Sequence, residues 1–174
     1  MFQTGVKRFG CLAGLMLLVL TGCGESQEEQ AFRQQLKDKA LNDETRQLGT
    51  AFLAENAQKA GIQITPSGLQ YRIETPGEGP RPRITDRVTV HYEGQRIDGV
   101  VFDSSYQRGE PSVFPLNRVI RGWTEGVGLM NKGAVWTFYI PPELAYGATS
   151  PSDDIPANST LIFKVELLDF EPAN

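Results

Sequence analysis

The stretch Val119-Ile120-Arg121-Gly122-Trp123 joins a β-branched pair to a large indole across one glycine. A helix that begins here turns the indole inward. The indole buries a large apolar area, and its N–H needs a partner only where that end of the ring is dry. Trp123 therefore suits the base of a core or of a pocket. Residues on other predicted elements converge around it and favour a pocket: Tyr92, Phe102-Asp103, Phe114, Tyr146, Ile155 and Phe163.

The composition indicates one globular domain with extensions. The chain has 174 residues, of which 40% are hydrophobic and nine are phenylalanine, and this is enough for a real core. Its formal net charge of −4 argues against a nucleic-acid surface, which normally shows clustered lysine and arginine. We therefore expect no nucleic-acid partner.

The N-terminus has the features of an export signal. Lys7 and Arg8 precede an apolar run, residues 9–20, which is too short to cross a bilayer as a stable helix but suits the core of a signal peptide. The next residues, Leu20-Thr21-Gly22-Cys23, resemble the bacterial lipobox. We expect residues 1–22 to be a lipoprotein signal peptide and Cys23 to be lipidated. The alternative is an ordinary core helix with an incidental cysteine.

Resemblance to bacterial lipoproteins implies a thioether-linked diacylglycerol and an N-acyl chain on Cys23. More than one acyl chain makes the attachment durable, because each buried methylene contributes about 0.8 kcal/mol. Gly24 stands where inner-membrane lipoproteins carry Asp. We therefore expect a lipid-anchored protein of the bacterial envelope, attached to the outer membrane and facing the periplasm or the cell surface.

The exported part of the chain offers no predicted metal or cofactor site. Cys11 lies in the signal and Cys23 is expected to be acylated, so no thiol is left for a disulfide or a thiolate ligand. The single histidine, His91, has no second histidine at metal-binding spacing. Beside Tyr92 on a strand, it points to the opposite face. We expect His91 to be structural, and we expect no metal and no cofactor.

Residues 23–62 are predicted to form the lipidated cysteine and a helical arm. Asn42 or Asp43 can cap a second helical segment, and Gly61 is the predicted stop. The apolar stripe is too narrow to build a core, so the arm lies on the domain, spaces it from the membrane or pairs with a second copy. We favour a homodimer that forms through residues at helical spacing: Phe32, Leu36, Leu48 and Phe52.

Residues 63–174 are predicted to form an α+β domain. A hairpin turn at Asp98-Gly99 places Tyr92 and Phe102 on one side of the sheet. Residues 121–130 are predicted to be the only short helix after the arm, and the expected fold is a curved antiparallel sheet wrapped on this helix. The long loop at 146–159 is expected to be functional or mobile. Alternation predicts these inward-facing strand residues: Leu69, Tyr71 and Ile73; Val88, Val90 and Tyr92; Trp136, Phe138 and Ile140; Leu161, Phe163, Val165 and Leu167.

A series of sequence blocks resembles the FKBP-type peptidyl-prolyl isomerases, in their order and approximate spacing, from about residue 68 to about residue 170. The blocks are Val90-His91-Tyr92, Phe102-Asp103-Ser104-Ser105, Phe114-Pro115-Leu116, Val119-Ile120-Arg121-Gly122-Trp123, Glu125-Gly126-Val127, Ile140-Pro141-Pro142, Ala145-Tyr146-Gly147 and Phe163-Lys164-Val165-Glu166-Leu167-Leu168. The stretch Phe52-Leu53-Ala54-Glu55-Asn56-Ala57 is similar to the macrophage infectivity potentiator branch, whose members often carry an N-terminal helical dimerisation region.

The resemblance implies an FKBP-like fold and non-covalent isomerisation of X–Pro bonds in exported proteins. It implies proline-containing polypeptides as partners and macrolides as inhibitors. Asp103 is expected to pair with Arg108 and with the Tyr92 hydroxyl, and to act by positioning or electrostatic assistance; the alternative is a turn residue that holds Ser104 or Ser105. The implied catalytic residues are Tyr92, Phe102, Asp103 and Tyr146, and the implied substrate-binding residues are Arg108, Val119, Ile120, Trp123, Ile155 and Phe163.

Three rim positions depart from the family pattern, namely Ser112, Pro151 and Asp154, and they bear on substrate choice and macrolide affinity. Two other functions fit the sequence. The same groove can hold proline-containing or unfolded segments as a non-catalytic chaperone or binding module of the envelope. A structural lipoprotein fits the anchor, but it explains neither the aromatic convergence nor the loop at 146–159.

Overall fold

The computed structural model describes residues 26–41 and 43–172. Within these ranges no helix is both long and apolar enough to cross a bilayer. In chain order the elements are α1 (Gln27–Leu41), α2 (Glu44–Asn56), β1 (Ile62–Ile64), β2 (Gln70–Thr75), β3 (Arg87–Arg96), β4 (Val101–Ser104), α3 (Ser105–Arg108), β5 (Ser112–Pro115), the 3-10 helix η1 (Leu116–Arg118), α4 (Arg121–Leu129), β6 (Val135–Ile140), the 3-10 helix η2 (Pro142–Leu144) and β7 (Leu161–Glu171).

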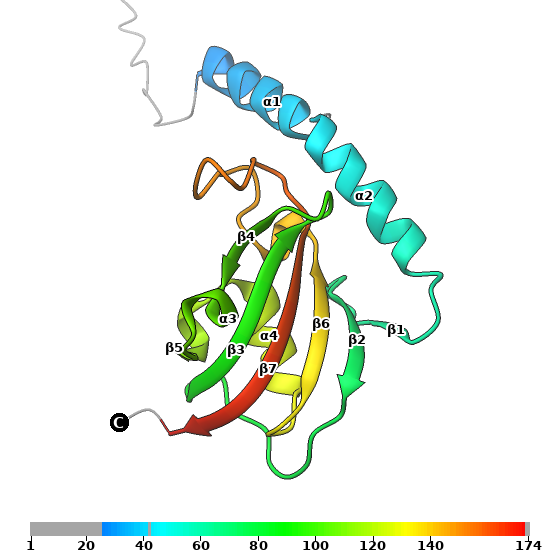
Figure 1. The fold of residues 1–174 in the computed structure, drawn as a ribbon. Coiled ribbons are helices and arrows are strands. Elements are labelled where there is room, and N and C mark those ends of the chain that lie inside the picture. The colour runs from blue at the N-terminus through cyan, green and yellow to red at the C-terminus, as the bar shows by residue number, and fades with distance from the viewer. Residues whose placement is uncertain (1–25, 42, 173–174) are drawn as a thin grey trace, which may run out of the picture.

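The strands form one antiparallel sheet that curves around α4, as Figure 1 shows. The strand order is β1-β2-β6-β7-β3-β4, and β5 pairs with β3 outside this path. The long strand β7 is central and pairs with both β3 and β6. The predicted α+β fold, a curved sheet wrapped on a short helix after an N-terminal helical arm, is confirmed.

The core lies between the concave face of the sheet and α4. Val88 and Val90 are fully buried and Tyr92 is 5% exposed, as their alternation in β3 predicts. Phe138 and Leu167, on β6 and β7, are also fully buried. On β2 the alternation fails at its end, because Ile73 is 37% exposed. The prediction of an inward-facing Ile73 is therefore wrong.

Close approach of α4 to β6 depends on glycine. A Cβ on Gly126 would lie 2.5 Å from Cε1 of Phe138, and a Cβ on Gly122 would lie 2.6 Å from Cγ2 of Ile140. Real Cβ atoms do not approach so closely, so any side chain at these positions forces the helix away from the strand. The helix therefore settles on β6 with Trp123, one residue after Gly122, held against the sheet.

The helix α4 is not the only short helix after the arm, and that prediction is wrong. Three further short helices, α3, η1 and η2, interrupt the strands and loops. The first is stabilised locally, because the Ser104 hydroxyl accepts a hydrogen bond from the Gln107 N–H at 3.3 Å and caps its N-terminus. The third begins with Pro142, which suits the first position of a helix.

The arm is made of α1 and α2, and α2 lies on the domain. Asp43 caps α2 by accepting from the Arg46 N–H, as predicted for Asn42 or Asp43. The helix ends at Asn56, so the predicted stop at Gly61 is wrong; Gly61 instead has a φ of +81° in the turn before β1. The second half of α2 is adjacent to β2 and β6 in Figure 1.

Buried polar and aromatic contacts dock α2. The Asn56 side-chain amide donates to Gln70 Oε1 at 2.9 Å, and the Gln70 amide donates to the Leu53 carbonyl at 2.9 Å. The ring of Phe52 lies 6.1 Å from that of Tyr139 on β6. Phe52 is therefore half-buried against its own protomer, and the predicted dimer stripe that includes it stays a prediction.

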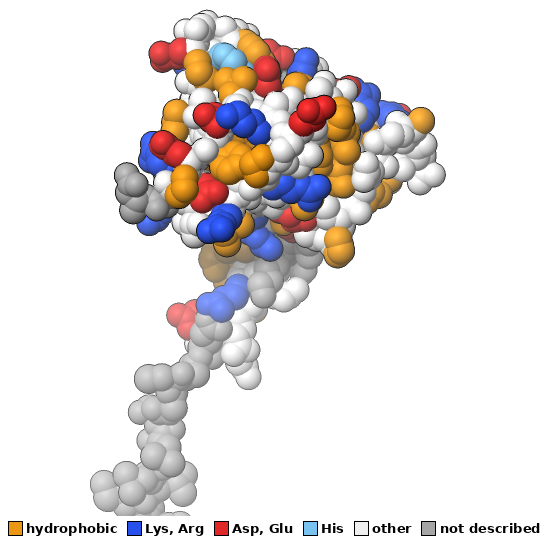
Figure 2. Space-filling view, turned by 90° about the horizontal axis from the view of Figure 1, so that it is seen from below, with side chains coloured by type: hydrophobic (Ala, Val, Ile, Leu, Met, Phe, Trp, Pro, Cys, Tyr) orange, Lys and Arg blue, Asp and Glu red, His pale blue; other side chains and the backbone are white. Residues whose placement is uncertain are grey.

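Surface charge on the lower face is mixed. Seen from below in Figure 2, hydrophobic side chains alternate with lysine or arginine and with aspartate or glutamate, and neither sign gathers into one area. The face therefore presents no uniform field of the kind that a polyanion would recognise.

The two glycines Gly126 and Gly128 provide a matched test of the α4–β6 contact. Nothing lies within 4 Å of a Cβ built on Gly128, whereas one on Gly126 meets the Phe138 ring. We expect Gly126→Ala to lower the free energy of unfolding by about 1–3 kcal/mol through overpacking. We expect Gly128→Ala to leave it unchanged or to raise it by up to about 1 kcal/mol through helix propensity. Urea unfolding followed by circular dichroism measures both, and equal effects would contradict the close contact.

Candidate functional site

A cavity of about 310 Å³ opens between α4, β3, β4 and the loop that follows η2. Seven of the predicted site residues line it: Tyr92, Asp103, Val119, Ile120, Trp123, Tyr146 and Phe163. They come from β3, β4, the junction of η1 and α4, the loop after η2, and β7. The fold thus assembles the cavity from segments that are up to about 70 residues apart in the chain.

Trp123 forms the base of this cavity. Three aromatic rings stand nearly perpendicular to the indole: Tyr92 with centroids 5.2 Å apart, Phe163 at 5.4 Å and Phe114 at 5.9 Å. Edge-to-face contacts of this kind are favourable beyond the area that they bury. The indole is 4% exposed, and its Nε1 has no hydrogen-bond partner among the described residues. The base is therefore rigid and predominantly apolar.

Asp103 is the only carboxylate among the lining residues, and it is already paired. The Tyr92 hydroxyl donates to one of its oxygens, and the Arg108 guanidinium binds the other. Arg108 also donates to the Tyr92 hydroxyl at 3.1 Å. The predicted triad of Asp103, Arg108 and Tyr92 is thus present, and the alternative in which Asp103 holds Ser104 or Ser105 is not what the geometry contains.

The helix α3 brings Arg108 to this carboxylate. Gly109 ends α3 in the left-handed region, with a φ of +78°, so the chain turns immediately after Arg108. Ser112, at the first position of β5, accepts from Arg108 at 3.0 Å. Ser112 departs from the family pattern at the rim, and in this structure it helps to orient the arginine.

Both phenols of the cavity are held in the neutral form. Burial, assisted by the hydrogen bond to Asp103, raises the pKa of Tyr92 above its ordinary value near 10. Burial and the negative charge of Asp103 raise the pKa of Tyr146. Neither hydroxyl carries a charge at neutral pH, and each remains a hydrogen-bond donor.

Three predicted site residues are not among those that line the cavity. The ring of Phe102 packs edge-on against Phe163, with centroids 5.5 Å apart, and so supports the wall. Ile155 is 6% exposed and is folded into the long loop by a bridge with Ser152. Arg108 acts through Asp103, as above. The predicted lipidation residue Cys23 lies outside the described residues.

Two lining residues were not assigned to the predicted site, Phe114 and Arg118. Phe114 is among the residues that the sequence predicts to converge around Trp123. The pairing of β5 with β3 brings it to the wall of the cavity. Arg118 carries no pattern of its own. Its only signal is its position directly before Val119 and Ile120.

His91 lies on the face of β3 opposite to Tyr92, where its side chain makes packing and hydrogen-bond contacts. Its Nδ1 lies 2.9 Å from the Ser105 hydroxyl, and its ring stacks on Tyr106 with centroids 4.7 Å apart. Across residues 26–41 and 43–172 no group of three His, Cys, Asp or Glu side chains is arranged to hold a metal ion.

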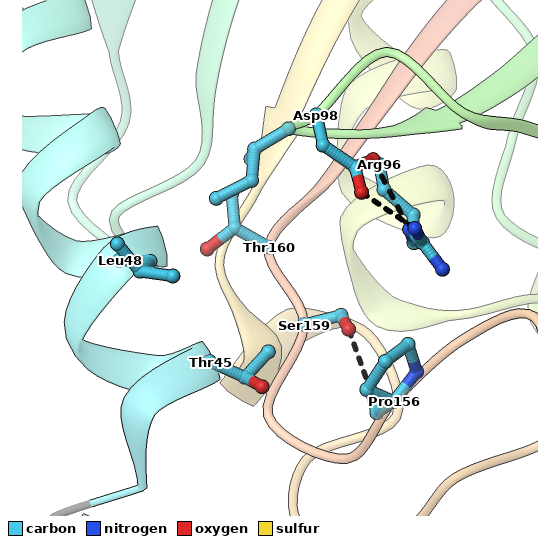
Figure 3. Close-up of a pocket in the computed structure, with 8 residues that line it drawn as sticks. Thr45, Leu48, Arg96, Asp98, Pro156, Ser159 and Thr160 are labelled. Carbon is cyan, nitrogen blue, oxygen red and sulfur yellow. Dashed lines mark hydrogen bonds and ion pairs between the residues drawn. The ribbon is translucent and has the colours of Figure 1, made fainter.

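A second cavity, of about 380 Å³, lies between α2 and the body and is drawn in Figure 3. Thr45 and Leu48 face it from α2, and Pro156, Ser159 and Thr160 face it from the end of the long loop. Some of its polar groups are paired with one another: Arg96 binds Asp98, and the Ser159 hydroxyl donates to the Pro156 carbonyl at 2.6 Å. This groove lacks the ring of aromatic side chains that the first cavity has.

The chain is similar to known proteins over most of its length. The family described as FKBP-type peptidyl-prolyl cis-trans isomerase matches residues 79–168, and the domain described as amino terminal to it matches residues 20–73. FkpA of Aeromonas hydrophila, named an FKBP-type peptidyl-prolyl cis-trans isomerase, is 52% identical over 78% of this chain and 51% of its own length. The outer membrane protein MIP of Legionella longbeachae is 46% identical over 75% of this chain and 56% of its own length.

A solved structure extends the similarity to the fold. The crystal structure of FkpA from Escherichia coli superposes with a TM-score of 0.73 at 41% sequence identity, covering 86% of this chain and 75% of that chain. The chain spans about half the length of the curated relatives that it matches. With a family match over half of the chain and a fold match at this identity, the chain belongs to the FKBP-type peptidyl-prolyl cis-trans isomerases.

Proposed function

We propose that this protein catalyses cis–trans isomerisation of X–Pro bonds in exported polypeptides. In this proposal residues 63–174 form the catalytic domain, residues 23–62 form the anchored arm, and the cavity is also the site for macrolide inhibitors. One observation carries the activity: an apolar cavity built on Trp123 whose single lining carboxylate is neutralised by its neighbours.

The chemistry requires no bond between protein and substrate. An X–Pro bond rotates over a barrier of roughly 18–20 kcal/mol, because rotation breaks amide resonance. In the twisted state the amide is less dipolar than in the planar state, so a water-poor site favours the twisted state if the cavity fits that shape. Trp123, Phe163 and Tyr92 supply such surroundings for the pyrrolidine ring.

Two donors are placed to bind the carbonyl groups that flank the rotating bond. The Ile120 N–H precedes α4 and has no role in the hydrogen-bond ladder of that helix. Tyr146 is 54 residues away from Tyr92 along the chain yet lines the same cavity, and the raised pKa of its hydroxyl keeps it a donor. Holding one flank of the substrate while the other turns is the role we assign to these groups.

The Tyr146 hydroxyl can be tested against a matched control. Tyr146 is 40% exposed and lines the cavity, whereas Tyr106 is 43% exposed and donates to Glu166 on the outer face at 3.1 Å. We expect Tyr146→Phe to lower kcat/KM on a proline peptide by about three- to tenfold, the value of one net hydrogen bond. We expect Tyr106→Phe to leave kcat/KM unchanged. Exchange spectroscopy by NMR on the full-length protein in detergent measures both.

The same assay separates catalysis from binding alone. A non-catalytic chaperone or binding module would occupy the cavity with the peptide and leave the exchange rate at its spontaneous value or below it. Acceleration of cis–trans exchange by the wild-type protein supports the enzyme, and its absence in a folded protein would end the proposal.

We propose attachment to the outer membrane through a lipid on Cys23. The lipobox-like Leu20-Thr21-Gly22-Cys23 supports this, and so does the relative that is named an outer membrane protein. We expect Cys23→Ser to abolish labelling by radioactive palmitate and to move the protein from the membrane fraction to the soluble fraction. Cys11→Ser, within the predicted signal, is the control and should leave both unchanged. Labelling that survives Cys23→Ser would contradict the anchor.

We infer that the arm pairs with a second copy through the part of its stripe that stays uncovered. Phe32 and Leu36 on α1 are 62% and 50% exposed, and Leu48 on α2 is 55% exposed; large apolar side chains left open to solvent favour a partner surface. We expect sedimentation of the full-length protein in detergent to give a dimer. The double change Phe32→Gln with Leu36→Gln should shift it to monomer, and a wild-type protein that sediments as a monomer would remove the inference.

A further inference from the structure

The charged side chains in and beside the cavity sum to a net charge opposite in sign to that of the chain. The chain has a formal net charge of −4, but the cavity is lined by one acidic residue, Asp103, and one basic residue, Arg118. Asp103 is bound by a further cation, Arg108, which does not itself line the cavity. Counting these three side chains, the region carries one uncompensated positive charge, and that charge belongs to Arg118.

Arg118 has no anionic partner of its own. Its side chain is exposed, and no ion pair or hydrogen bond of its guanidinium occurs among the described residues. The carboxylate that α4 carries, that of Glu125, accepts from the Ser67 hydroxyl at 2.6 Å and is therefore engaged elsewhere. The guanidinium is thus available to a ligand.

The backbone that carries Arg118 is fixed at the mouth of the cavity. Arg118 ends η1, whose first residue, Leu116, is fully buried. The Leu116 N–H donates to the Asp86 carbonyl at 2.9 Å, and the Leu116 carbonyl accepts from the Thr124 hydroxyl at 2.7 Å. These bonds tie η1 to the loop before β3 and to α4. The guanidinium therefore moves on its own side chain while its Cα keeps its position beside Val119.

We propose that Arg118 is a specificity-determining residue that favours polypeptides with a carboxylate next to the proline. This proposal rests on the proposed isomerase function. A guanidinium binds a carboxylate through two parallel hydrogen bonds, which gives it directional preference for Asp and Glu. When a proline occupies the cavity, the residues on either side of it lie at the rim, within the field of Arg118. A lysine or arginine at those positions is repelled by the same charge.

The experiment uses pairs of peptides that differ only in charge. Each pair has Glu or its neutral counterpart Gln, placed directly before the proline in one set and directly after it in the other. Exchange spectroscopy by NMR on the full-length protein in detergent gives kcat/KM without a coupling protease, which would add its own preference. For the wild type we expect the Glu peptide of at least one set to exceed its Gln counterpart by about two- to fivefold, the range of an exposed ion pair.

Variants then assign the preference to Arg118. We expect the ratio to fall to about one in Arg118→Gln and to invert in Arg118→Glu. Raising the salt to about 1 M, where the Debye length is about 3 Å, should shrink the wild-type ratio. The control is Arg33→Glu, the same substitution at an exposed arginine on α1, and it should keep the wild-type ratio.

The outcomes separate this proposal from the function on which it rests. A wild type that accelerates Glu and Gln peptides equally overturns the role of Arg118 and leaves the isomerase intact. A preference for Glu that persists in Arg118→Gln also overturns it, because another cation would then be responsible. A wild type that accelerates neither peptide instead contradicts the proposed function itself.

Discussion

Close packing of α4 against β6 is the constraint on which the site depends. Gly122 and Gly126 let the helix approach the Ile140 and Phe138 side chains more closely than any residue with a Cβ allows. Trp123 lies between these two glycines in the sequence, so the depth of the helix sets the depth of the indole. Three rings that stand perpendicular to the indole then lock it. The base of the cavity is therefore a product of backbone proximity, and the aromatic side chains complete it.

The electrostatics of the cavity depend on the ion pair and hydrogen bonds that one carboxylate receives. A lone carboxylate in apolar surroundings costs free energy unless it is paired and hydrogen-bonded. Asp103 meets this requirement through Arg108 and the Tyr92 hydroxyl, and Ser112 helps to hold the arginine. The result is a wall that contains a charged pair without offering a free anion to the substrate. Such a wall suits chemistry that works by shape and polarity and needs no proton transfer.

The sequence predicts the parts of this structure that follow from periodic burial. Strand β3 alternates strictly, and the Asp98-Gly99 turn fixes the hairpin, so the side of Tyr92 follows from residue order. The inward residues of β6 and β7 keep the same two-residue period, although neighbours on their other face are also buried. The short helices α3, η1 and η2 escape this reasoning, because a single turn depends on local caps such as Ser104 and shows no period. The exposure of Ile73 escapes it too, since alternation does not reveal where a sheet stops being covered.

Two further features could not be predicted from local sequence, and for a different reason: the docking of the arm and the presence of Arg118 in the cavity. The arm is placed by contacts between distant residues, such as Asn56 with Gln70, and nothing in either segment alone indicates the partner. A single arginine has no repeat to mark it. The resemblance to the family supplied Arg108 and Tyr146, which belong to shared motifs, but it left out Arg118, which does not. What could be predicted was therefore what is either periodic or shared.

The contact of α2 with Thr160 bears on how the arm is placed relative to the cavity. A Cβ on Gly49 would lie 2.4 Å from the Thr160 hydroxyl oxygen, so the helix meets the end of the long loop there with no side chain on the helix between them. Thr160 is the residue at which the long loop rejoins β7, and Asn56 and Phe52 fix the same helix to β2 and β6. Contacts with β2, with β6 and with the residue before β7 thus hold α2 on the body of the domain. The orientation of the cavity mouth is consequently set relative to α2. A partner or surface that orients this helix therefore also orients the mouth.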